Sequence, residues 1–133
     1  MLDASAALPL LLRDGQPSNE LLERFRSGEG AVVPGLFLVE IANVLATAVR
    51  RGRHREATVL DQLRRFAALP IAVRSEPVPP DRLVSLAIRR GLTAYDASYL
   101  ERARSSALAL ATTDAALARE AAAEGVELVI PLA

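Results

Sequence analysis

The chain has 133 residues, of which 51% are hydrophobic, so it can bury a core and is not expected to be disordered. Its 16 basic and 16 acidic residues balance, and the overall charge therefore indicates neither a nucleic-acid-binding protein nor one that binds acidic ligands. The absence of cysteine excludes disulfides and thiolate metal sites, and a single histidine, His54, argues against a multi-histidine metal site or a Ser-His-Asp triad.

Short β-like segments alternate with helical patterns along the whole chain. The helices are indicated by apolar residues at helical spacing, and most of the segments end at glycine or proline. In chain order we predict a strand at 1–2, helices at 5–13 and 18–28, a strand at 31–33, helices at 36–51 and 55–69, a strand at 71–73, helices at 81–90 and 93–106, a strand at 107–111, a helix at 115–124 and a strand at 126–130.

Strands that alternate with helices indicate an α/β fold, in which helices cover both faces of a parallel sheet. No repeat or linker divides the sequence, so a single domain over 1–133 is expected. No signal peptide is evident, and the longest apolar run, 36–49, is shorter than the roughly 20 residues of a membrane span, so we expect a cytoplasmic protein. In such sheets, functional residues lie beyond the carboxyl ends of the strands.

Four acidic residues stand next to apolar segments, where a carboxylate is costly to place: Asp3, Glu40, Asp96 and Asp114. If the fold gathers them, they form a negative pocket suited to Mg²⁺ or Mn²⁺, because these ions prefer oxygen ligands. One or two such ions would activate a water molecule and stabilise the leaving oxygen of a phosphodiester. The four residues therefore indicate metal-assisted phosphodiester chemistry.

Each acidic residue also has a structural alternative. Asp3 and Asp114 could be helix N-caps, and Thr93 with Asp96 could form a capping box. Capping does not explain Glu40, which lies in mid-helix. With Asn43 and Thr47 it forms one polar line, which alternatively faces solvent. Ser5 and Thr112 stand close in sequence to Asp3 and Asp114 and would orient ligands or water there, or else bond to the local backbone.

All 16 basic residues are arginine, which excludes a P-loop NTPase and argues against a receiver domain, because both use a lysine. The best candidates for contacts with phosphates are Arg50, Arg51, Arg53 and Arg55; Arg89, Arg90, Arg102 and Arg104 are others. The alternative is a set of solvated helix ends favoured by the helix dipole. His54 is expected to be an exposed turn residue. Tyr95 and Tyr99 are expected to pack against the core, with base stacking as the alternative.

Four segments, in order, resemble the motifs of the PIN domain family and, within it, of the VapC-like toxin ribonucleases of type II toxin–antitoxin systems. They read LDASA at 2–6, VEIANVL at 39–45 after Pro34, LTAYDASYL at 92–100 and LATTDAAL at 110–117. The resemblance implies a three-layer α/β/α fold around a parallel five-stranded sheet of order 3-2-1-4-5. Only two residues precede Asp3, so we expect either a start upstream of Met1 or an unusually short central strand.

The same resemblance implies a Mg²⁺- or Mn²⁺-dependent endoribonuclease that acts on tRNA or other structured RNA. Asp3 and Asp96 would be the principal metal ligands, and Asp114 would complete their set or hold a second ion. Glu40 would act through a water molecule, and the supporting residues would be Ser5, Asn43 and Thr112. The implied partners are a VapB-like antitoxin and a second copy of the chain.

Two other functions are compatible with these residues. One is a PIN-domain nuclease of RNA processing that belongs to no toxin–antitoxin pair. The other is a binding or regulatory module on the same fold that has no catalytic activity.

Overall fold

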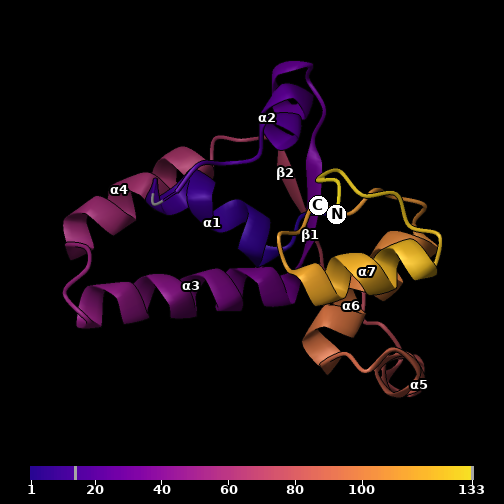
Figure 1. Ribbon diagram of the computed structural model, residues 1–133. Coiled ribbons are helices and arrows are strands. Elements are labelled where there is room, and N and C mark those ends of the chain that lie inside the picture. The colour runs from indigo at the N-terminus through magenta and orange to yellow at the C-terminus, as the bar shows by residue number, and fades with distance from the viewer. Residues whose placement is uncertain (14, 133) are drawn as a thin grey trace.

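Two short parallel strands lie at the centre of the molecule, with helices on either side of them (Figure 1). The computed structural model describes residues 1–13 and 15–132. The helices are α1 (Ala4–Leu12), α2 (Asn19–Arg26), α3 (Gly35–Arg50), α4 (Glu56–Phe66), α5 (Pro80–Arg90), α6 (Ala94–Ser105) and α7 (Ala115–Ala123), and the strands are β1 (Ala31–Pro34) and β2 (Ile71–Arg74). Each predicted helix is present, with its ends shifted by at most a few residues.

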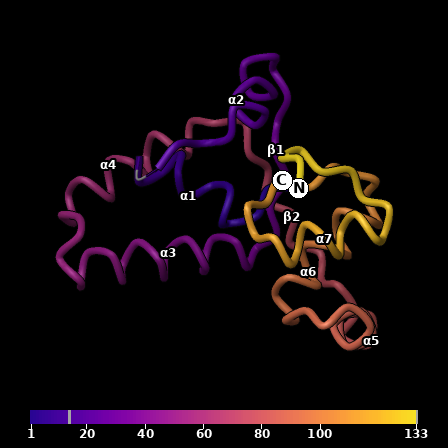
Figure 2. Tube along the Cα trace, viewed as in Figure 1, coloured from indigo at the N-terminus to yellow at the C-terminus, as the bar shows by residue number. Residues whose placement is uncertain are grey.

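The sheet is parallel, as predicted, but smaller than predicted. In β1 and β2, Ala31 is paired with Ile71, and the register continues to Pro34 and Arg74. The amide of Leu2 donates to the carbonyl oxygen of Val32 at 2.9 Å, so the start of the chain lies beside β1 (Figure 2).

Two isolated parallel bridges extend this arrangement, one between Leu2 and Ala111 and one between Leu110 and Leu128. The predictions of regular strands at 107–111 and 126–130 are therefore wrong for the described residues, where each segment contributes only bridges. One reason is that Ala107 adopts a left-handed backbone conformation, with φ of 52°, as the chain turns out of α6. Only the last residues of that segment are left to run beside Leu2. The full five-strand order stays a prediction.

Helix α3 turns one face to the core. Its buried residues are Phe37, Ile41, Leu45 and Ala48, which follow the helical repeat. The rings of Phe37 and Phe66 stack with their centroids 6.1 Å apart, which joins α3 to α4. The opposite face of α3 is not buried, because Leu38 and Val39 are 54% and 70% exposed.

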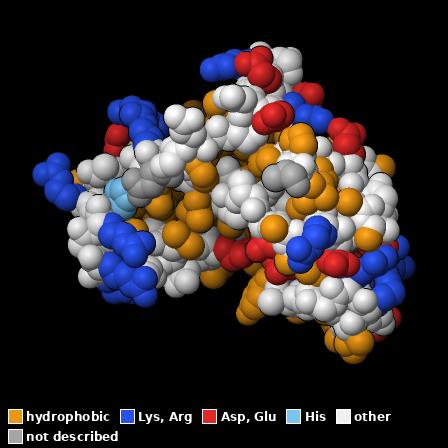
Figure 3. Space-filling model, in the orientation of Figure 1, with side chains coloured by type: hydrophobic (Ala, Val, Ile, Leu, Met, Phe, Trp, Pro, Cys, Tyr) orange, Lys and Arg blue, Asp and Glu red, His pale blue; other side chains and the backbone are white. Residues whose placement is uncertain are grey.

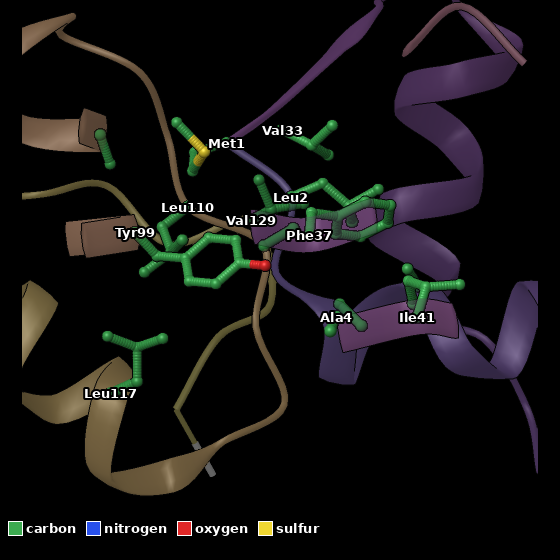
Figure 4. Packing of buried hydrophobic residues seen from close by; sticks show 14 of the residues in the cluster. Met1, Leu2, Ala4, Val33, Phe37, Ile41, Tyr99, Leu110, Leu117 and Val129 are labelled. Atoms are coloured by element: carbon green, nitrogen blue, oxygen red, sulfur yellow. The ribbon is translucent and has the colours of Figure 1, made fainter. Parts of the chain in front are cut away.

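Helix α6 is buried along most of its length, because the other helices α5 and α7 and the segment from Leu110 cover it. Fully buried side chains around it include Tyr99, Leu110 and Leu2 (Figure 4). The buried Glu101 of α6 accepts a hydrogen bond from Arg104 at 2.8 Å, which satisfies its charge.

Within the described residues, no helix has the length and apolar character needed to cross a membrane.

We predict that Phe37→Ala lowers the free energy of unfolding by about 3–5 kcal/mol, because it leaves a cavity beside Phe66. Leu38→Ala, the control on the same helix, should change it by less than about 1 kcal/mol, because Leu38 is half exposed. Urea unfolding followed by circular dichroism measures both values. Equal losses in the two variants would contradict the assignment of the core face of α3.

Candidate active site

Asp3 is a buried carboxylate held by two hydroxyl groups. It is 6% exposed, and its Oδ2 accepts hydrogen bonds from Ser5 Oγ at 2.6 Å and from Thr112 Oγ1 at 2.8 Å. Its side chain makes no capping bond to α1, although the residue occupies the N-cap position. The capping alternative therefore does not describe this carboxylate, and Ser5 and Thr112 lie where they can orient it.

The segment before α7 is joined to the segment before α1 by the same hydroxyl groups. Thr113 donates its amide to Ser5 Oγ at 2.9 Å, and the Asp114 amide donates to Thr112 Oγ1 at 3.1 Å. Asp114 Oδ1 accepts from the Leu117 amide at 2.8 Å, so Asp114 does cap α7. These contacts place Asp114 next to the Asp3 segment.

Asp96 lies in the first turn of α6. The Thr93 hydroxyl accepts a hydrogen bond from the Asp96 amide at 3.1 Å and donates one to Asp96 Oδ2 at 2.9 Å. Thr93 therefore caps α6 and at the same time orients the Asp96 carboxylate. A capping contact and a functional role are compatible here, because only one of the two carboxylate oxygens is used.

Glu40 lies in the second turn of α3 and is half-buried. The Tyr99 hydroxyl of α6 donates a hydrogen bond to Glu40 Oε1 at 2.7 Å. Burial, with the adjacent Glu40 charge, raises the pKa of Tyr99, so the hydroxyl remains a donor. From the sequence, Tyr99 was expected to pack against the core, with base stacking as the alternative. Its position three residues after Asp96, which places both on one face of a helix, was the signal that could have identified it.

The charges of the four carboxylates act on one another. Burial, and then repulsion by Asp3 and Asp96, raises the pKa of Glu40, while the Tyr99 hydrogen bond partly offsets this. Burial, and then repulsion by Asp114 and Asp3, raises the pKa of Asp96, while the Thr93 hydrogen bond opposes it. Each acidic residue thus has a Coulomb interaction with at least one of the others, although the four come from distant segments. Figure 3 shows acidic side chains gathered near the middle of the molecule, between the two groups of helices.

Each of these carboxylates is held by only one of its two oxygens. Across residues 1–13 and 15–132, the side-chain hydrogen bonds fall on Oδ2 of Asp3, Oε1 of Glu40, Oδ2 of Asp96 and Oδ1 of Asp114. The second oxygen of each is left for another ligand. An all-oxygen donor set of this kind suits a hard divalent cation.

The described part of the chain contains no group of three or more His, Cys, Asp or Glu side chains that is already close enough to hold a metal ion. The oxygen donors suit a divalent metal by their chemistry, whereas their positions do not form a closed set of ligands.

Asn43, expected beside the carboxylates, lies further along α3 and is exposed. With Thr47, Arg51 and Arg53 it lines a surface hollow of about 240 Å³. His54 lines the same hollow and is half-buried, so the expectation of an exposed turn residue is wrong. Arg50 and Arg55, which are close to these residues in the sequence, are exposed. Figure 3 shows basic side chains at the end of the molecule where α3 meets α4.

The other arginine candidates are engaged in contacts within the protein. Arg89 and Arg90 pair with Glu124 at 2.8 and 2.7 Å, Arg104 pairs with Glu101, and Arg102 donates to the Glu76 carbonyl. Tyr95 is 65% exposed, so the expectation that it packs against the core is wrong. The arginines at 50–55 are therefore the better candidates for contacts with phosphates.

We predict that Asp96→Asn raises the melting temperature at pH 7 by roughly 2–4 °C when metal is chelated, because it removes a repelled charge. A raised pKa means that protonation favours the folded state. That stabilisation is complete below the ordinary carboxyl pKa, near 4, and is lost as the pH rises through the raised value. The difference between variant and wild type should therefore shrink as the pH falls towards 4. Asp61→Asn is the control, and a lower melting temperature for Asp96→Asn at pH 7 would contradict the repulsion.

The chain is similar to known proteins over nearly its whole length. The family model described as the PIN domain matches residues 1–123. VapC ribonuclease Mb0985 of Mycobacterium bovis and ribonuclease VapC9 of Mycobacterium tuberculosis are each 36% identical over 131 residues, which is 98% of either chain. Exonuclease VapC9 of Pyrobaculum aerophilum is 38% identical over 79 residues, 59% of this chain and 58% of that one.

A solved structure agrees with these similarities. The crystal structure of PAE2754 from Pyrobaculum aerophilum matches with a TM-score of 0.72 and 31% identity, covering 90% of this chain and 82% of that one. The match to the PIN domain model extends over the segments that carry all four carboxylates. The chain belongs to the PIN domain family.

Proposed function

We propose that this protein is a Mg²⁺- or Mn²⁺-dependent endoribonuclease and the toxin of a VapBC-type toxin–antitoxin pair. Its substrate would be tRNA or another structured RNA. The observation that carries the proposal is a set of four carboxylates from four segments, each with one oxygen held by a hydrogen bond, among which Asp3 repels both Glu40 and Asp96. Relatives named VapC ribonucleases, similar over 98% of the chain, support the same function.

Asp3 and Asp96 would be the principal metal ligands, and Asp114 would complete the set. A bound divalent ion supplies positive charge to the phosphate and lowers the pKa of a water molecule. Ser5 and Thr112 fix the orientation of Asp3, and Thr93 fixes that of Asp96. Glu40, whose charge is disfavoured by burial, would accept a hydrogen bond or a proton from the attacking water.

The RNA would cross the polar line of α3. Asn43 and Thr47 lead from Glu40 towards the hollow lined by Arg51 and Arg53. Arginine side chains at that end would contact RNA phosphates, together with the exposed Arg50 and Arg55. The groups that position the substrate would thus lie on the same helix as Glu40.

The assembly and the complete sheet are part of the same proposal. A VapB-like antitoxin would hold the toxin inactive, and the toxin would form a homodimer, as the family resemblance implies. We also propose one domain over 1–133 with the sheet order 3-2-1-4-5. The bridges from Leu2 to Ala111 and from Leu110 to Leu128, together with the bond from Leu2 to Val32, support that order.

We predict that Asp3→Asn and Asp96→Asn each lower Mn²⁺-dependent RNA cleavage at least about 100-fold, because each removes a negatively charged ligand. A circular RNA substrate tests the mode of attack, since an exonuclease needs an end and one relative is named an exonuclease. Asp61→Asn, an exposed acidic residue paired with Arg65, is the control and should cleave like wild type.

Two results would count against this function. If purified wild type leaves RNA intact with Mn²⁺, and expression of wild type is as harmless as that of the variants, a toxin nuclease is excluded. Cleavage of linear but not circular RNA would replace the endonuclease with an exonuclease.

We predict that millimolar Mg²⁺ or Mn²⁺ raises the melting temperature of wild type by a few degrees, because a ligand that binds only the folded state stabilises it. The combined variant Asp3→Asn with Asp96→Asn should lose this shift. Differential scanning calorimetry with and without metal measures it. Equal shifts in both proteins would place the ion elsewhere on the chain.

A further inference from the structure

The Tyr99 hydroxyl connects α6 to the Glu40 carboxylate of α3. We propose that Tyr99 is a positioning residue, which holds Glu40 towards Asp3 and Asp96 through its hydrogen bond to Oε1. This inference rests on the proposed nuclease function, to which it adds a residue outside the four acidic side chains. It assigns Tyr99 no contact with RNA or metal.

Packing alone does not require the hydroxyl of Tyr99. The side chain is 0% exposed, and its ring lies among buried apolar residues such as Leu110, Phe37 and Val129 (Figure 4). A phenylalanine would fill the same space, whereas a buried hydroxyl is costly unless it is hydrogen-bonded. Its partner is Glu40 Oε1 at 2.7 Å, the short length typical of a bond to a charged acceptor.

Glu40 depends on this bond more than the other carboxylates depend on theirs. Asp3, Asp96 and Asp114 each have a partner within three residues along the chain, namely Ser5, Thr93 and the Leu117 amide. In the described part of the chain, the side-chain hydrogen bond of Glu40 comes instead from a residue 59 positions away. Without it, no local contact would fix the Glu40 carboxylate.

Repulsion between carboxylates is the reason why the Glu40 side chain needs a hydrogen bond to hold it in place. Asp3 and Asp96 repel the Glu40 carboxylate, and Glu40 stands on α3 next to the exposed Val39, close to solvent. A freed side chain would turn outward to lower the repulsion. Because Tyr99 follows Asp96 by three residues, α6 carries one carboxylate itself and holds a second through the hydroxyl. The position of the buried helix α6 therefore determines the distance between the Asp96 and Glu40 carboxylates.

The test is a double-mutant cycle with Tyr99→Phe and Glu40→Ala, measured as Mn²⁺-dependent cleavage of circular RNA. We expect Tyr99→Phe to lower kcat about tenfold and to leave KM within about twofold, because a hydrogen bond to a charged group is lost. In the Glu40→Ala background, Tyr99→Phe should cost less than about twofold, since there is no carboxylate left to hold. Tyr95→Phe, which removes an exposed hydroxyl from the first turn of the same helix, is the matched control and should retain wild-type kcat.

A spectroscopic measurement reports on the contact without cleavage and without removing the hydroxyl. The chain has two tyrosines and no tryptophan, so in Tyr95→Phe the tyrosine absorbance band, which lies at longer wavelength than that of phenylalanine, comes from Tyr99 alone. Adding Glu40→Gln replaces a charged acceptor with a neutral one and should shift that absorbance to shorter wavelength. An unchanged spectrum would overturn the contact, even if Tyr99→Phe failed to fold.

The kinetic outcomes separate the two proposals. Absence of cleavage by wild type would overturn the nuclease function. Two results would overturn the positioning role alone. One is a Tyr99→Phe variant that has the kcat of wild type. The other is a loss in kcat from Tyr99→Phe that is just as large in the Glu40→Ala background. A reduced kcat that disappears in the Glu40→Ala background supports it.

Discussion

The architecture of this protein depends on bringing like charges together at the edge of its core. Burial, and then repulsion, raises the pKa of Glu40 and of Asp96, so their ionised forms oppose folding at neutral pH. Hydrogen bonds from Tyr99 and Thr93 offset part of this cost, and those from Ser5 and Thr112 fix one oxygen of Asp3. The fold thus maintains an arrangement that a cation, but not the protein alone, would neutralise.

Helix α6 organises this arrangement. It is buried among α5, α7 and the segment from Leu110, which leaves it little freedom to move. Asp96 begins it and Tyr99 follows one turn later, so the position of one rigid element determines where two carboxylates lie. The paired arginines on α5 and α6 contribute to this rigidity, because they satisfy the buried Glu101 and the half-buried Glu124.

The helices could be predicted from the sequence because their signals are local. Ser18 and Thr93 cap α2 and α6 with their side chains, and glycines or prolines stand near the ends of most helices. The strands were harder to predict from the sequence, because a strand forms only where a second segment pairs with it. The segment at 107–111 is apolar enough for a strand, yet the turn at Ala107 leaves only its last residues paired. Burial could not be predicted reliably from local sequence either, since Tyr95 was expected to pack against the core but is exposed.

By itself, the sequence determined the α/β class, the positions of the helices and the identity of the four acidic residues, because each follows from neighbouring residues along the chain. Only the tertiary structure decided that these residues act on one another and which hydroxyl holds each of them. Coulomb repulsion and hydrogen bonding depend on distance in space, and the pairs Tyr99–Glu40 and Thr112–Asp3 join residues 59 and 109 positions apart. No local pattern encodes such separations, which arise when burial of the apolar faces brings the segments into contact.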